Sequence, residues 1–265
     1  MKIKYSQAYF DNPKVWNPEV WRKREGDLER ARLATEWLPG EVSSVLDVGC
    51  GNGVYTNLLE LERFKVGLDL SRIALEYITA PRLQADASLL PFVENSFDAS
   101  LCMEMLEHLP LPVYQSALNE LVRVSRKYIL ITVPFNEKLR YGTVVCPVCL
   151  HSFHPFHHVR QFQLDNFKSL FGTHWRQVRL EGVVPTRREA LPGLWNLIRV
   201  YQHRQGRNFP NMAICPRCGY TSAKHVSAVQ QVSRAHSVRS TLSHLWPKRT
   251  TFTWWMAFYR KEALR

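Results

Sequence analysis

The sequence predicts an α/β fold in which helices cover both faces of a mostly parallel sheet. Short runs of apolar, β-branched residues recur along residues 45–133, and segments with helical periodicity separate them. A glycine-rich turn at residues 49–53 directly follows the first run. A single helix between two strands implies that the strands are parallel, because the chain must return to the same end of the sheet. At 265 residues, the chain can bury a sizeable core in one such domain with an insertion.

The first predicted strand, residues 45–48, contains Asp47 and leads into the sequence Gly49-Cys50-Gly51-Asn52-Gly53. Glycine has no Cβ, so its backbone can approach a bound group closely. A strand, a glycine turn and a helix in this order are typical of domains that bind nucleotide-like cofactors. Dinucleotide-binding enzymes carry G-x-G-x-x-G at this place, whereas the third glycine here comes one residue earlier.

The other elements follow from hydrophobic periodicity. The predicted strands are residues 45–48, 64–69, 82–85, 97–102 and 128–133, and the predicted helices are residues 54–62, 71–79 and 112–126. Four acids fall at or just past strand ends: Asp47, Asp69, Asp86 and Glu104. Ligands of open α/β sheets bind at the carboxyl ends of the strands, so we expect these acids at one site. Asp69 is placed to hold a ribose diol.

Both ends of the chain add to this core. Residues 1–20 are too aromatic for a disordered tail, and residues 22–38 have the spacing of an amphipathic helix. The predicted domains are an N-terminal aromatic segment and helix (1–40), a sheet domain (41–184 plus 250–262) and a basic insertion (185–249).

The net charge of +12 lies entirely in the C-terminal third of the chain. Residues 1–185 contain 21 Lys/Arg and 21 Asp/Glu, whereas residues 186–265 contain 14 Lys/Arg against Glu189 and Glu262. This asymmetry indicates a phosphate group, a nucleic acid or a membrane surface as partner, with a solvated basic face as the alternative. No run of about 18 apolar residues and no signal-peptide core occurs, so we expect a cytoplasmic protein without a transmembrane segment.

Four of the six cysteines form two C-P-x-C pairs, Cys146 with Cys149 and Cys215 with Cys218. In a cytoplasmic enzyme this pattern favours a metal over disulfides. Each pair presents two thiolates, so the two pairs together suffice for one tetrahedral Zn²⁺. We therefore expect a closed, structural zinc site of the zinc-ribbon type. A nearby run of histidines could supply a ligand instead: His151, His154, His157 and His158.

Four stretches in register resemble the class I S-adenosylmethionine-dependent methyltransferases, in particular the type 11/12-like small-molecule enzymes. They are the glycine turn with residues 66–69, residues 82–92, residues 96–109 and residues 128–134. The resemblance covers roughly residues 41–180 and implies a Rossmann-like, seven-stranded, mostly parallel sheet. The resemblance further implies a helix at residues 164–171, a sixth strand at 175–184 and a seventh, antiparallel strand at 252–259. In this family the last two strands form a nearly direct hairpin, so the zinc-binding insertion is the clearest departure from the common pattern.

The resemblance also implies a binding site for S-adenosylmethionine. The glycine turn would contact the methionyl portion, Asp69 the ribose hydroxyls and Asp86 the adenine amine. The full expected cofactor set is Asp47, Gly49, Cys50, Gly51, Gly53, Asp69, Leu70, Ser71, Asp86, Ala87, Met103 and Glu104. In related enzymes an N-terminal segment folds over the cofactor as a lid; packing on the sheet edge is the alternative for residues 1–20.

Methyl transfer is an in-line displacement that needs aligned reactants, and a hydroxyl acceptor also needs a base. His108 follows the fourth strand and His158 the fifth, so they are the candidate bases, although His108 could instead cap a helix. The fourth strand lacks the Asn/Asp-Pro-Pro-Tyr and Pro-Cys motifs of nucleic-acid-methylating enzymes. We therefore expect transfer to a hydroxyl of a small molecule or glycan, including an anionic one.

Two alternatives remain open at this stage. One is an RNA methyltransferase whose basic zinc-ribbon insertion holds nucleic acid, and the other is a non-catalytic scaffold. Residues 222–245 carry an apolar stripe with Lys224, Arg234 and Arg239, which predicts a helix that packs on the sheet domain and faces an anionic acceptor. A helix on a membrane surface is the alternative. The sequence does not indicate the oligomeric state.

Overall fold

The computed structural model describes residues 7–17, 25–59, 62–189, 209–210, 213–222 and 248–262. The chain divides into two compact units. The sheet unit comprises residues 1–137, 159–184 and 252–265, and the cysteine unit comprises residues 138–158 and 185–251. The cysteine unit is thus formed from two separate parts of the chain. One lies between β5 and β8, and the other runs from the end of β8 to the start of β9.

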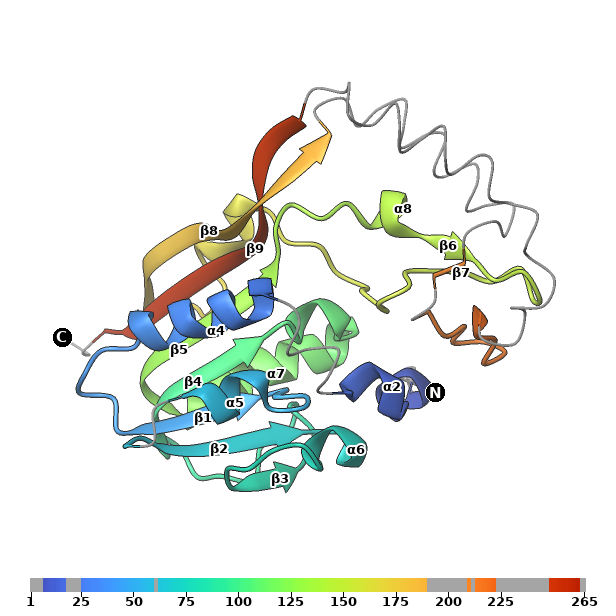
Figure 1. The fold of residues 1–265 in the computed structure, drawn as a ribbon. Helices are drawn as coiled ribbons and strands as arrows, with labels where there is room; N and C mark the ends of the chain where they lie inside the picture. The colour runs from blue at the N-terminus through green and yellow to red at the C-terminus, as the bar shows by residue number, and fades with distance from the viewer. Residues whose placement is uncertain are drawn as a thin grey trace. The chain divides into compact units, whose positions relative to one another are not determined.

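The sheet contains seven strands in the order β3-β2-β1-β4-β5-β9-β8 (Figure 1). The strands are β1 Ser44–Val48, β2 Phe64–Asp69, β3 Arg82–Gln84, β4 Phe97–Met103, β5 Ser125–Pro134, β8 Trp175–Glu189 and β9 Lys248–Lys261. Strands β1 to β5 pair in parallel, and β9 runs antiparallel to β5 with Ala257 opposite Ile131. This arrangement confirms the predicted Rossmann-like, mostly parallel sheet.

Helices cover both faces of the sheet (Figure 1). On one face, α4 (Glu25–Trp37) and α5 (Val54–Leu58) pack on a cluster that includes Leu130 of β5. On the other face, α7 (Leu111–Val124) packs on a cluster that includes Ile131. Successive side chains of a strand point to opposite faces, so each central strand supplies both cores. Strands buried on both faces explain the nearly continuous apolar runs in the sequence.

The remaining elements are short. They are α1 Gln7–Phe10, α2 Pro13–Trp16, α6 Arg72–Leu75, α8 Leu139–Gly142, the 3₁₀ turns η1 Leu106–His108 and η2 Leu164–Phe167, and the two-stranded sheet β6 Val144–Val145 with β7 Ser152–Phe153. The predicted helix at residues 164–171 is wrong, because only η2 forms there. Phe167 and Phe171 are both buried in the core under α7, and Gly172 then turns the chain with φ +78°. Burial of these two phenylalanines therefore stabilises a short 3₁₀ turn and a bend in place of the predicted longer helix.

Most of the predicted helix at residues 222–245 lies outside the described residues. Among the helices that the structure does describe, none has the length and apolar character needed to cross a bilayer.

Candidate functional site

The glycine turn between β1 and α5 has a backbone that only glycine adopts without strain. Gly49, Gly51 and Gly53 have φ values of +73°, +55° and +76°. A Cβ on Gly49 would lie 2.7 Å from Met105, and one on Gly51 would lie 2.6 Å from Trp16. Conformation and close neighbours thus both require glycine at the first two positions.

Two predicted site acids hold this turn in place. Asp69, at the end of β2, accepts hydrogen bonds from the backbone N–H of Gly51 and of Ser71, each at 2.8 Å. Asp47 is fully buried and accepts a 2.6 Å hydrogen bond from the Thr56 hydroxyl. Burial raises the pKa of Asp47 to about 7. Each Asp69 oxygen retains a second lone pair, so the carboxylate can still accept from a ribose hydroxyl.

The other predicted cofactor residues lie at or just past the ends of β1, β2, β3 and β4. Asp86 accepts two 2.8 Å hydrogen bonds from Ser88, and Ala87 packs against the core under α7. The Ser71 hydroxyl caps α6, and Cys50 is buried beside this helix. Their neighbours include Leu70, which is 38% exposed, and Met103 of β4, which is buried. The carboxyl ends of β1, β2, β3 and β4 therefore carry the expected set.

Arg30 is a site residue that the sequence analysis missed. Its side chain is 2% exposed and forms ion pairs with Asp27 at 2.7 Å and with Glu104 at 3.3 Å. The guanidinium also lies 3.9 Å from the ring centroid of Trp254. Glu104, which follows β4, adopts a positive φ of 61°. The available sequence clue was an arginine beside Ala31 and Ala34, on the apolar side of the predicted amphipathic helix.

Several buried polar atoms next to the glycine turn have no hydrogen-bond partner among the described residues. They are Nε of Arg30, Oη of Tyr55 and Oδ1 of Asp47. Buried polar atoms in native proteins are almost always paired, so this set fits a polar ligand. A guanidinium donor beside carboxylate acceptors matches the carboxylate and ammonium groups of an amino acid. The chemistry of these residues therefore fits the methionyl end of S-adenosylmethionine.

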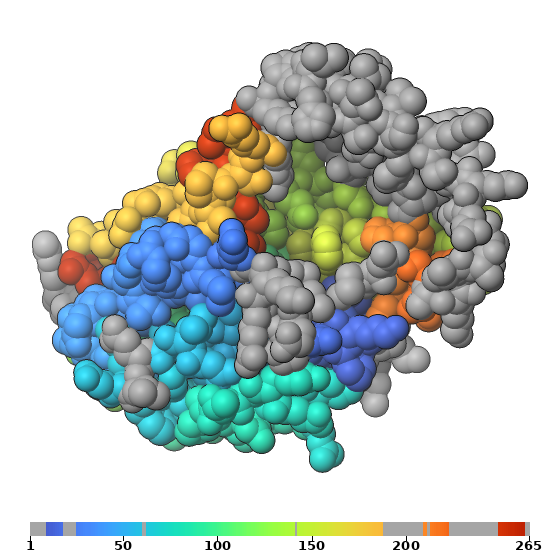
Figure 2. Space-filling model, viewed as in Figure 1, coloured from blue at the N-terminus to red at the C-terminus, as the bar shows by residue number. Residues whose placement is uncertain are grey.

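The N-terminal helices α1 and α2 lie against this site. The Asn52 side chain donates to the Trp16 carbonyl at 3.1 Å, and the Ser71 hydroxyl donates to the Phe10 carbonyl at 2.7 Å. In Figure 2 this dark-blue segment lies on the turquoise surface of α6. The segment thus contacts the cofactor loops themselves, as a lid would.

His108 lies in η1, just after β4. The ring of Phe10 meets it edge-on, with 5.5 Å between the centroids. The neighbouring Glu107 is fully buried, and burial together with the nearby Glu104 raises the pKa of its carboxyl well above its usual range. The second predicted base, His158, belongs to the cysteine unit, where its ring stacks on His154 at 4.5 Å.

The four predicted metal ligands come together in the cysteine unit. The Sγ atoms of Cys146, Cys149, Cys215 and Cys218 all lie within 4.8 Å of one another. The distances are 3.6 Å from Cys146 to Cys218 and 3.5 Å from Cys149 to Cys215, far longer than a disulfide bond of about 2.05 Å. Four sulfurs around a tetrahedral zinc at about 2.3 Å would be about 3.8 Å apart. The donor set therefore fits Zn²⁺.

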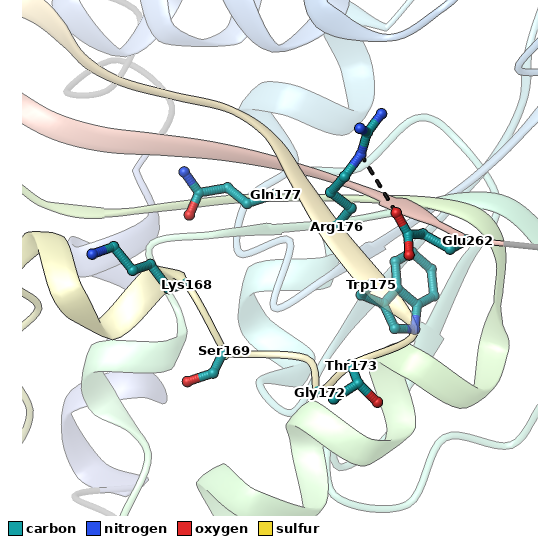
Figure 3. Close-up of a pocket in the computed structure, with 8 residues that line it drawn as sticks. All are labelled: Lys168, Ser169, Gly172, Thr173, Trp175, Arg176, Gln177 and Glu262. Atoms are coloured by element: carbon teal, nitrogen blue, oxygen red, sulfur yellow. Dashed lines mark ion pairs between the residues drawn. The ribbon is translucent and has the colours of Figure 1, made fainter.

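A separate hollow of about 510 Å³ lies at the start of β8 and the end of β9 (Figure 3). Arg176 and Glu262 form an ion pair there at 3.6 Å. Because Tyr128 at the start of β5 pairs with Arg260, this hollow belongs to the end of the sheet opposite the glycine turn. None of the predicted site residues lines it.

A parallel sheet with a glycine turn and acids at its carboxyl ends defines a domain that binds a nucleotide-like cofactor. Residues 46–129 match the family model of a methyltransferase domain. A ubiquinone biosynthesis O-methyltransferase of Alkalilimnicola ehrlichii is 31% identical over 175 residues, which cover 57% of this chain and 70% of that protein. The chain belongs to the class I S-adenosylmethionine-dependent methyltransferases.

Two further comparisons show sequence similarity and a shared fold. An uncharacterized protein of Methanocaldococcus jannaschii is 30% identical over 132 residues, which cover 48% of this chain and 56% of that protein. The chain spans about half the length of the first two curated relatives that it matches. A solved S-adenosylmethionine-dependent methyltransferase from Archaeoglobus fulgidus shares the fold, with a TM-score of 0.54, 16% identity and coverage of 92% of this chain and 97% of that one.

A second solved structure also shares the fold. It is the complex between the Haloferax volcanii Trm112 methyltransferase activator and a putative methyltransferase. The match has a TM-score of 0.57 and 15% identity, and it covers 97% of this chain and 99% of the matched chain.

Proposed function

We propose that this protein transfers the methyl group of S-adenosylmethionine to a hydroxyl group of a small molecule or glycan. The observation that carries the proposal is the set of buried, unpartnered polar atoms of Arg30, Tyr55 and Asp47 beside the glycine turn. The ubiquinone biosynthesis O-methyltransferases among its relatives support a hydroxyl acceptor.

The chain's own residues would bind and orient both reactants. Arg30 would pair with the cofactor carboxylate, Asp69 would accept from the ribose and Asp86 from the adenine amine. When bound, S-adenosylmethionine supplies an electrophilic methyl group. Helices α1 and α2 would limit the access of water, because Trp16 already lies over Gly51. Alignment of donor and acceptor supplies most of the catalytic effect in such a displacement.

His108 would take the proton of the acceptor hydroxyl. It follows β4 on the 3₁₀ turn η1, close to Glu104, and its ring packs against Phe10 of the N-terminal segment. Neutral imidazole suits this role because its ordinary pKa lies near working pH. His158 is the second candidate base. A variant in which it is replaced should be assayed beside the His108 variant.

Calorimetry and a methyl-transfer assay test the proposal. Asp69→Ala should weaken the binding of S-adenosylmethionine by about 1–3 kcal/mol, because it removes a charged acceptor. Asp165→Ala is the matched control, since the side chain of Asp165 is 89% exposed. His108→Asn should preserve cofactor binding but abolish transfer to hydroxyl acceptors near neutral pH. Unchanged affinity in Asp69→Ala would refute the assignment of the cofactor site.

The cysteine cluster supports a structural zinc ion, held by Cys146, Cys149, Cys215 and Cys218. The backbone hydrogen bond from His151 lowers the pKa of the Cys149 thiol to about 7, whereas burial raises the pKa of the Cys215 thiol to about 12. Burial lowers the pKa of His157 to about 4, so this imidazole stays neutral. We expect one zinc per chain by metal analysis, and none in Cys146→Ser/Cys215→Ser. A metal-free wild-type protein purified without chelator would refute the site.

The charge of the insertion favours a second candidate, an RNA methyltransferase. Transfer of labelled methyl groups to total RNA, compared with transfer to phenolic and sugar hydroxyls, separates the two candidates. Labelled RNA would replace the small-molecule proposal, whereas labelled small molecules alone would retain it.

A further inference from the structure

The two cysteine pairs form the same backbone turn. The N–H of Leu150 donates to the Cys146 carbonyl at 3.0 Å, and the N–H of Gly219 donates to the Cys215 carbonyl at 2.9 Å. Leu150 and Gly219 therefore occupy equivalent positions, directly after the second cysteine of each pair. Both have a positive φ, 57° for Leu150 and 71° for Gly219. Glycine suits this conformation, whereas leucine is strained in it.

The leucine at this strained position lies mostly in solvent. Leu150 is 76% exposed, and Val148 in the same turn is 62% exposed. The second turn presents the exposed Arg217. The Cys146 and Cys218 sulfurs lie 3.6 Å apart, so the two turns lie side by side. We call Val148, Leu150 and Arg217 the knuckle tip.

The unit that carries the knuckle tip also carries the whole net charge of the protein. The cysteine unit contains 13 Lys/Arg against one acid, Glu189, whereas the sheet unit contains 22 Lys/Arg and 22 Asp/Glu. The exposed basic residues that the structure describes in this unit are Lys138, Arg140, Arg187, Arg217 and Arg249. The partner of this unit is therefore expected to be strongly anionic.

We propose that the knuckle tip docks on the surface of an anionic lipid membrane, with Leu150 and Val148 inserted among the lipids. Aliphatic side chains gain free energy in the acyl boundary, and nearby Lys and Arg are attracted to anionic headgroups. Single-stranded nucleic acid is favoured less, because its bases stack mainly on aromatic side chains and the apolar residues of the knuckle tip, Val148 and Leu150, are aliphatic. An exposed leucine in a strained turn is thus explained by a contact outside the chain. This inference goes beyond the proposed function and does not depend on the methyl acceptor.

Vesicle flotation with the full-length, zinc-loaded protein tests the proposal. The protein should float with vesicles of equal parts phosphatidylglycerol and phosphatidylcholine, and not with pure phosphatidylcholine. Leu150→Gly should lower the partition coefficient about tenfold, because it removes one inserted side chain while giving the turn its preferred residue. Arg217→Glu should lower it about tenfold or more at about 0.1 M salt, and added salt should weaken binding further.

Leu89→Gly is the matched control, since Leu89 is 77% exposed but belongs to the sheet unit. It should float like the wild type. Zinc content equal to that of the wild type shows that the Leu150→Gly turn is folded. The proposal is overturned if Leu150→Gly with full zinc floats as well as Leu89→Gly. It is equally overturned if the protein does not bind anionic vesicles. This includes the case in which the wild type and Leu150→Gly both bind a single-stranded oligonucleotide instead.

Discussion

Replacement of Arg30 by methionine tests the buried ion-pair cluster at the carboxyl end of β4. Methionine has a similarly long, unbranched side chain but carries no charge. The variant loses the ion pairs to Asp27 and Glu104, at 2.7 and 3.3 Å, and the stacking over Trp254. Asp27 is only 4% exposed, so water cannot replace the guanidinium.

The size of the effect follows from this burial. Removal of one partner of a buried ion pair costs about 3–5 kcal/mol of stability, because the remaining charge stays desolvated. Glu104 is 25% exposed at its side chain, so water compensates part of its loss and the lower end of that range applies. A free-energy loss of about 3 kcal/mol lowers the unfolding midpoint by about 6–12 °C in a domain of this size.

Thermal unfolding of the variant beside a matched control measures the effect. Arg32 lies on the same helix, is 55% exposed and pairs with Glu29 at 2.7 Å. Arg32→Met should therefore lose no more than about 1 kcal/mol. Asp27→Asn in the Arg30→Met background should restore part of the loss, since it removes the buried carboxylate whose ion pair with Arg30 is lost. Equal midpoints for the two methionine variants would show that the Arg30 cluster contributes nothing special to stability.

Two further predictions concern the cofactor loops. Gly51→Ala should displace Trp16, because its Cβ would lie 2.6 Å from that ring, and should raise the quenching of tryptophan fluorescence by iodide. Gly172→Ala is the control: its φ of +78° gives similar backbone strain, but nothing lies within 4 Å of its Cβ. Equal quenching in both variants would refute the contact of the N-terminal segment with the turn. For Asp47, the pKa of about 7 in the folded state exceeds the ordinary value of 3.8, so the folded state holds the proton more tightly. Its contribution to the free energy of unfolding should thus fall as pH rises from about 4 to about 7. Urea unfolding of Asp47→Asn across this range should lack that decline, and parallel curves for variant and wild type would contradict it.

The sequence predicted the sheet because its pattern is local. Parallel strands buried on both faces give continuous apolar runs such as residues 128–133, and these runs alternate with segments of helical period. The glycine turn is equally local, since each positive φ depends on the residue that adopts it. The spacing of the cysteine pairs likewise indicated a common site, because a knuckle of two thiolates needs only four consecutive residues.

The tertiary structure decided what depends on contacts between distant residues. Arg30 on α4 and Glu104 after β4 are far apart in the sequence and meet only in the folded chain. The position of Arg30 on the apolar side of its helix could indicate burial, but it could not identify the partner. The family resemblance implied a helix at residues 164–171, but burial of Phe167 and Phe171 under α7 stabilises a different backbone path. Leu150 resembles a core residue in the sequence; only the fold shows that it is exposed, because its turn lies at the surface of the cysteine unit. Local backbone preferences depend on the identity of single residues, whereas burial and charge pairing arise only once the whole chain has packed.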